Sequence, residues 1–222
     1  STIDGIIDAD ARVASLKWTF NFNNISLVPR EARAKILLPE GAVVERATMW
    51  IDGQEKEAKI MGRSKARATY ERAVRTHSRD PLLVSMQGKD TVLVQCYPVL
   101  KESDTKIRLQ IAAPMTSSDR NHAELSLPTF AERNFAFTRG HNLNLAGKTK
   151  FTITNTDFAS APSKEGTQSI AASLENSLLS RHEARVLAEV TPAIPYDATA
   201  DILKEKLKTL TLITDVEVSG AD

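Results

Sequence analysis

The side chains that could do chemistry are few and widely spaced in this sequence. Four histidines lie far apart, without the ligand spacing of a zinc motif: His77, His122, His141 and His182. The single cysteine, Cys96, excludes an intrachain disulfide. Neither a phosphate-binding glycine loop nor a nucleophile elbow occurs. Asn24-Ile25-Ser26 fits the N-glycosylation pattern, a triplet that also arises by chance. We therefore expect structural or solvated histidines, and no catalytic residue, metal or cofactor.

One group of charged residues is unusually dense. Six cations fall within seventeen residues that contain a single acid, Glu71; they are Arg63, Lys65, Arg67, Arg72, Arg75 and Arg79. Such a patch suits phosphates, sulfated glycans or an acidic protein. The same spacing is typical of the solvated face of an amphipathic helix, whose basic stems cover apolar neighbours. Both interpretations stay open, and these six residues are the candidate contact surface.

The composition limits the class of partner. A net charge of +1 balances 29 basic against 28 acidic residues, so no global field favours nucleic acid or a membrane. With 222 residues, 41% of them hydrophobic, the chain can bury a substantial core. No apolar run approaches the length of about 18 residues that a spanning helix needs. Because the sequence lacks an initiator methionine, we interpret it as a fragment of a larger protein.

The stretch 63–78 predicts a helix. Ala66, Tyr70, Val74 and His77 fall along one stripe of a 3.6-residue period. Pro81 then ends it, because proline donates no N–H and pushes the preceding residue out of the α region.

The rest of the first half alternates as β-strands do. About seven strands are expected before Pro114, near residues 14–22, 32–38, 43–51, 56–60, 82–86, 91–97 and 106–111. Short strands between turns, with one inserted helix at about 63–78, favour a mainly β fold, an antiparallel β-sandwich, over alternating βαβ units. The expected core residues are Trp18, Phe20, Trp50 and Tyr70.

The second half predicts a smaller β-rich region. Strand-length segments occur at 123–127, 135–138, 150–154, 170–174 and 184–190. A helix at 197–210, with an apolar stripe that includes Leu203 and Leu207, competes with a strand over 209–218. We therefore predict a sandwich domain over 1–115 and a β-rich region over 116–222, which is either a second sandwich or an extension of the first.

Two short blocks carry a family resemblance. The first runs from Lys65-Ala66 to Tyr70-Glu71-Arg72-Ala73, and the second is Arg79-Asp80-Pro81-Leu82-Leu83. Together with the order of the strands around them, they resemble the VIT domain, the module named for vault proteins and inter-alpha-trypsin inhibitor heavy chains. The resemblance covers about residues 13–114. It departs at Gln110-Ile111-Ala112, where members often carry a tyrosine, so it defines the sheet edge there less well.

The resemblance implies a β-sandwich with one packed helix in a modular parent. VIT domains usually precede a von Willebrand factor A domain, whose Asp-x-Ser-x-Ser motif binds a divalent cation. The nearest match, Asp215–Ser219, has Glu217 in place of the first serine, so we place any such domain outside this fragment. The parent is expected to be secreted or membrane-anchored and this piece extracytoplasmic, although a cytoplasmic location fits the single cysteine equally well.

Our first hypothesis is thus a non-enzymatic protein-interaction or scaffolding domain, which binds a protein partner or an adjacent domain of its own chain. The alternative is a domain that binds or hydrolyses a surface polymer, such as a glycan, in a cleft between the two β regions. That alternative predicts carboxylates that converge in a concave pocket. A weaker third hypothesis is phosphate or nucleic-acid binding through the basic helix.

Overall fold

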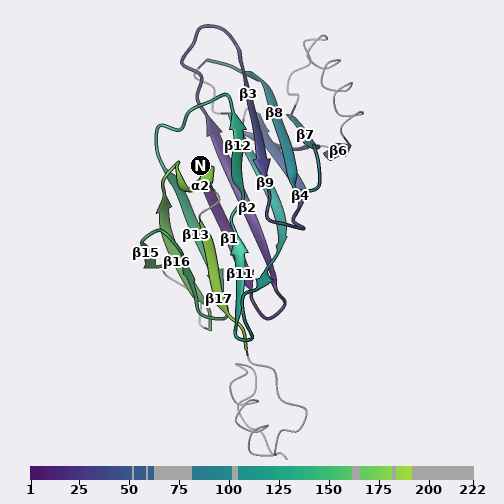
Figure 1. The fold of residues 1–222 in the computed structure, drawn as a ribbon. Helices are drawn as coiled ribbons and strands as arrows, with labels where there is room; N and C mark the ends of the chain where they lie inside the picture. Colours follow the sequence, from purple (N-terminus) through teal and green to yellow (C-terminus); the bar gives the residue numbers. More distant parts are fainter. Residues whose placement is uncertain are drawn as a thin grey trace, which may run out of the picture.

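The computed structural model describes residues 1–51, 53–58, 60–62, 82–101, 105–161, 166–181 and 184–191. Within these ranges the chain is mainly β, as predicted, with three sheets and one short helix, α2 (Leu178–Arg181) (Figure 1). The predicted helix over 63–78, Tyr70 and the predicted segment 197–210 lie outside the described residues.

The largest sheet has eight strands in the order β15-β16-β13-β1-β2-β9-β4-β5. In chain order these are β1 (Thr2–Asp8), β2 (Val13–Phe22), β4 (Val43–Ile51), β5 (Gln54–Ala58), β9 (Thr105–Pro114), β13 (His141–Gly147), β15 (Phe158–Ser160) and β16 (Gln168–Leu174). All neighbours in this sheet are antiparallel except β1 and β13, which are parallel.

Two smaller sheets cover the inner face of the large one. The five-stranded sheet has the order β12 (Thr129–Arg133), β3 (Arg30–Leu37), β8 (Thr91–Val99), β7 (Leu82–Met86) and β6 (Ile60–Gly62). The four-stranded sheet has the order β10 (Thr116–Ser117), β11 (His122–Ser126), β17 (Arg185–Glu189) and β14 (Phe151–Ile153). Buried side chains from all three sheets form one hydrophobic core.

Most strands of the first half are confirmed. Along β2, Leu16, Trp18 and Phe20 are buried while the residues between them are more exposed, as a half-buried strand requires. The two predicted hairpins are present, because β4 pairs with β5 and β7 pairs with β8.

The core contains a group of rings that we call the aromatic cluster. Phe130 on β12 is its centre, and its ring centroid lies 4.8 Å from that of Trp18 and 5.4 Å from that of Phe137. The other rings of the cluster are Phe20, Phe22, Phe135 and His141. The cluster joins the large sheet to the five-stranded sheet.

The predicted strand over 135–138 is wrong. These residues follow β12 without forming a strand. Phe135 and Phe137 alternate there because both rings pack edge-on in the aromatic cluster, with centroids 5.5 Å apart. Conversely, the sequence reading missed β1, because Gly5 interrupts its apolar alternation. A Cβ on Gly5 would lie 2.6 Å from Cδ2 of Leu145 and 2.8 Å from Cδ2 of Leu16, so a larger residue there would force both buried leucine side chains to shift.

Trp50 does not belong to the core. The register between β4 and β9 shifts after Val44, so Glu45 forms a bulge that reverses the faces of the following residues. Ala47 and Met49 therefore point inward, while Trp50 lies half-buried on the outer face beneath Lys106 and Arg108 of β9.

The strand β9 lies inside the sheet. It pairs with β2 on one side and with β4 on the other, so residues 110–112 are not at a sheet edge.

The parallel pair of β1 and β13 joins the two halves of the sequence. Through this pair, β13, β16 and β15 extend the sheet that the first half begins. The division at residue 115 stays a prediction about domain organisation.

Candidate interaction surfaces

The predicted contact surface belongs to a part of the chain that the structure does not describe. Its six residues, Arg63, Lys65, Arg67, Arg72, Arg75 and Arg79, all lie outside the described residues. Two other surfaces emerge from the described part of the chain, one on the outer face of the large sheet and one at the end of the molecule.

The first is a hollow on the outer face of the large sheet, with a volume of about 430 Å³, which we call the sheet groove. It runs across β2, β1, β13 and β16. Its polar lining is Asp4, Ser15, Lys17, Asn144 and Ser169, and its apolar lining includes Ile6, Ala146 and Ala161.

Strand register explains why the sheet is hollow here. Ile6 lies opposite Ser15 on β2 and Ala146 on β13, and Ala146 lies opposite Ser169 on β16. Small side chains in this row leave space beside Ile6, which is 65% exposed.

The next row of the same sheet is polar. Asp4 lies opposite Lys17 on one side and Asn144 on the other, and the Asn144 amide donates a 2.8 Å hydrogen bond to Asp4 Oδ1. The sheet groove thus combines an exposed aliphatic side chain with one carboxylate, one ammonium group and an oriented amide. Such a mixture recognises a ligand with both apolar and hydrogen-bonding groups.

The second surface is the loop of residues 24–29 between β2 and β3, which we call the apolar loop. It lies at the upper end of the molecule in Figure 1. Ile25 is 87% exposed and Leu27 is 85% exposed. Two further aliphatic residues are half-exposed: Val28 in the same loop, and Leu100 directly after β8.

Asn24 fixes the apolar loop. Its side chain is buried, and its Nδ2 donates to the carbonyl oxygens of Val28 at 2.9 Å and Val99 at 2.8 Å. Its Oδ1 accepts a 2.9 Å hydrogen bond from the Ser26 backbone N–H. The amide nitrogen that a glycan would need is therefore held inside the fold, so Asn24 has a structural role here.

The family of the first half is now clear. Residues 5–111 match the family model of the vault protein inter-alpha-trypsin (VIT) domain. The chain contains a VIT domain. The match begins inside β1 and ends inside β9, and both the apolar loop and the β1–β2 side of the sheet groove belong to it. A VIT domain indicates a module for protein interaction.

Distant likeness extends to some larger solved structures. The M1 zinc metallopeptidase from Deinococcus radiodurans is 10% identical with a TM-score of 0.46, covering 84% of this chain and 41% of that one. A mutant of that enzyme bound to Tyr-Ser-Ala substrate is 11% identical with a TM-score of 0.44 and the same coverage. The chain thus spans less than half the length of these structures, and such a distant likeness says nothing of its activity. No curated protein matches the chain.

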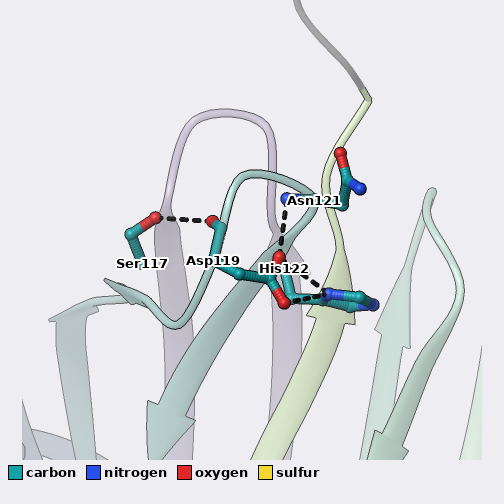
Figure 2. A network of polar contacts seen from close by, with 4 residues as sticks. All are labelled: Ser117, Asp119, Asn121 and His122. Atoms are coloured by element: carbon teal, nitrogen blue, oxygen red, sulfur yellow. Dashed lines mark hydrogen bonds and ion pairs between the residues drawn. The ribbon is translucent and has the colours of Figure 1, made fainter.

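Both described histidines take part in structural networks. His122 follows the tip of the β10–β11 hairpin, just beyond the VIT domain, where its Nδ1 lies 2.8 Å from Asp119 Oδ2 (Figure 2). Asp119 Oδ1 also accepts the Asn121 backbone N–H at 2.7 Å, and the Ser117 hydroxyl donates to the Asp119 carbonyl at 2.9 Å. The hydrogen bond from the Asn121 backbone N–H, and then that of the His122 side chain, lowers the pKa of Asp119 below its usual range. The carboxylate thus closes a turn.

His141 lies in the core, beside the VIT domain. The Ser1 hydroxyl lies 2.6 Å from its Nδ1, and Asn176 Oδ1 lies 2.8 Å from its Nε2. Ser, His and Asn are residue types of some catalytic triads, but His141 is fully buried and its ring packs on Phe137 at 4.4 Å, which leaves no room for a substrate. Burial, and then the positive charge of the Ser1 ammonium group, lowers the pKa of His141 to about 4.

Two further findings concern the described residues alone. No helix among them is long and apolar enough to cross a membrane. They also contain no group of three or more His, Cys, Asp or Glu side chains that could hold a metal ion.

Sequence reasoning missed both surfaces. The sheet groove depends on the parallel pairing of β1 with β13, more than a hundred residues apart, for which the sequence carries no local signal. The apolar loop did carry a signal, because three aliphatic residues occur between two strands where polar turn residues are usual.

Proposed function

We propose that the chain is a non-enzymatic protein-interaction and scaffolding domain of a larger modular protein. In this proposal the sheet groove receives a polypeptide segment of the partner. The exposed Ile6 side chain, in a hollow rimmed by Asp4, Lys17 and Asn144, carries the proposal. The VIT family match supports it.

The groove suits part of a polypeptide better than a small isolated ligand. An aliphatic side chain of the partner would pack on Ile6 and fill the space above Ala146 and Ser15. Backbone or side-chain polar groups of the same segment would bond Asp4, Lys17 and Asn144, which fixes its direction.

The partner that we favour is an adjacent domain of the same parent, such as a von Willebrand factor A domain outside these 222 residues. We further propose that the parent is membrane-anchored and that this domain is extracytoplasmic. The support for both is the VIT match, because the family resemblance implies a modular parent that is often secreted or membrane-associated.

Site-specific photo-cross-linking in the full-length parent tests the groove. A photoreactive amino acid at Ile6 should cross-link to a defined polypeptide segment, and Asp4→Lys should reduce that yield at least about fivefold because it reverses the rim charge. The matched control position is Val43, an exposed aliphatic residue at the start of β4. Equal yields from both positions, or none from Ile6, would refute the proposal.

A second candidate function is glycan binding in the same groove. Its support is the position of the groove between strands of the two sequence segments, with hydroxyl and amide groups in the lining. Glycosidic hydrolysis generally uses two carboxyl groups, and within the described lining the acidic residue is Asp4. We therefore propose binding without hydrolysis for this candidate. Titration calorimetry with soluble polysaccharides, with wild type and Asn144→Ala, would decide it: heat that the variant loses supports it, and no heat from wild type excludes it for those polymers.

A further inference from the structure

The apolar loop is the one place in the described structure where exposed aliphatic side chains follow one another closely. Ile25, Leu27 and Val28 occupy a single loop, and Leu100 follows Val99, whose carbonyl accepts from Asn24. The isolated bridge between Asn24 and Lys101 fixes the end of β8 beside the loop. These four residues therefore form one apolar tip.

Holding these side chains in water has no benefit for the fold. Covering exposed apolar surface removes it from water, and this lowers the free energy in proportion to the area covered. A loop chosen for solubility would carry polar turn residues at these positions. The tip is therefore expected to be covered by a partner surface.

The loop is held in shape without the help of a partner. Ser26 bonds the loop twice, because its N–H donates to Asn24 Oδ1 and its hydroxyl donates to the Val28 carbonyl at 2.8 Å. Arg30 Nε adds a 3.2 Å hydrogen bond to the Ser26 hydroxyl. Because the Ser26 N–H and the Val28 carbonyl are bonded internally, these groups can leave water at low cost, as an apolar medium demands.

We infer that the apolar loop inserts into the surface of a lipid bilayer. The exposed large side chains of its tip are aliphatic, whereas the energetic centres of protein interfaces are enriched in Trp, Tyr and Arg and poor in Leu and Val. At its base, the exposed cation Arg30 would meet anionic headgroups. The neighbouring acid Glu31 accepts a hydrogen bond from Gln95 on β8.

The chemistry predicts weak and reversible attachment. Full burial of one Ile or Leu side chain is worth about tenfold or more in a partition constant. Two or three such side chains give binding of the order of one short lipid anchor, which needs a second signal for stable attachment. This inference concerns a different surface from the sheet groove and does not depend on the proposed function.

Vesicle co-sedimentation of the whole 222-residue chain tests it directly. The probe is a vesicle of phosphatidylcholine with about one third phosphatidylglycerol. Wild type should co-sediment, and Ile25→Asp/Leu27→Asp should lower the partition constant at least about a hundredfold. The matched control is Val43→Asp, also exposed and aliphatic, which should bind as wild type does. Circular dichroism would confirm that all three proteins are folded.

A second readout reports insertion itself. Leu27→Cys can carry an environment-sensitive fluorophore, because the native Cys96 is buried and should not react. The fluorophore should shift to the blue with vesicles, whereas the same label in Val43→Cys should not. No co-sedimentation of wild type, equal loss in the Val43 control, or an unshifted Leu27 label would each overturn the inference. Cross-linking of Leu27 to a protein without vesicle binding would overturn it in favour of a protein partner.

Discussion

The aromatic cluster lies between the large sheet and the five-stranded sheet, and the apolar loop joins strands β2 and β3 of the same two sheets. The two regions place their apolar side chains in opposite environments. Around Phe130, rings from the large sheet and the five-stranded sheet are packed within 4.8 to 6.2 Å of one another. In the loop, Ile25 and Leu27 contact mostly solvent.

Each region contains one buried polar side chain, but the two side chains have different roles. In the cluster, one buried polar side chain, His141, is surrounded by rings and satisfied by Ser1 and Asn176. In the loop, one buried amide, Asn24, holds aliphatic side chains outward. The comparison indicates that the cluster stabilises the fold and that the loop is built for contact.

Removing the centre of the cluster should have the largest effect. Phe130→Ala should lower the free energy of unfolding by about 3–5 kcal/mol, because it leaves a cavity between two sheets. Phe158→Ala on the edge strand β15, where the ring is 40% exposed, is the matched control and should cost less than about 1 kcal/mol. Urea denaturation followed by tryptophan fluorescence measures both, and similar losses would break the comparison.

Protonation of the buried histidine should have the next largest effect. Because burial lowers the pKa of His141 to about 4 in the folded chain, the unfolded chain takes up the proton first as pH falls. Stability should therefore decrease from near pH 6.5 down to near pH 4, by about 2 kcal/mol between pH 7 and pH 5.

Urea midpoints at the two pH values would show this decrease. His141→Gln should flatten the profile. A wild-type profile that is flat or rises towards pH 5 would contradict the neutral, buried state of His141.

Loss of the loop anchor should have a smaller effect. Asn24→Ala removes hydrogen bonds to Val28, Val99 and Ser26 and should cost about 1–2 kcal/mol, because it leaves the Val99 carbonyl, which accepts a buried hydrogen bond, without this donor. The control is Asn23→Ala, at the exposed neighbouring residue, which should change the free energy of unfolding by close to zero. Hydrogen exchange at Ser26 should rise in the first variant alone; unchanged exchange would show that Asn24 does not fix the loop.

The sequence predicted what depends on local pattern. The predictions of a strand around Trp18 and of a hairpin between β4 and β5 were correct. Alternating apolar residues and turn residues determine such elements within a few positions of the sequence. Trp50 was misplaced because one bulged residue, Glu45, reverses the faces of a strand without a signal in composition.

The candidate surfaces were beyond local pattern. The sheet groove is formed by β1 pairing with a strand from the other half of the chain, and Gly5 hides β1 from a search for alternating residues. The basic cluster, from Arg63 to Arg79, stays a prediction because it lies outside the described residues. The family was predictable because its motif residues occur in order, although the match begins earlier, inside β1.

The most direct test of the comparison is the unfolding free energy of Ile25→Ser/Leu27→Ser in urea at pH 7. If these side chains serve contact and not the core, the double variant should unfold within about 0.5 kcal/mol of wild type. A loss of more than about 2 kcal/mol would show that they stabilise the fold, and would contradict the account of the loop as a contact surface.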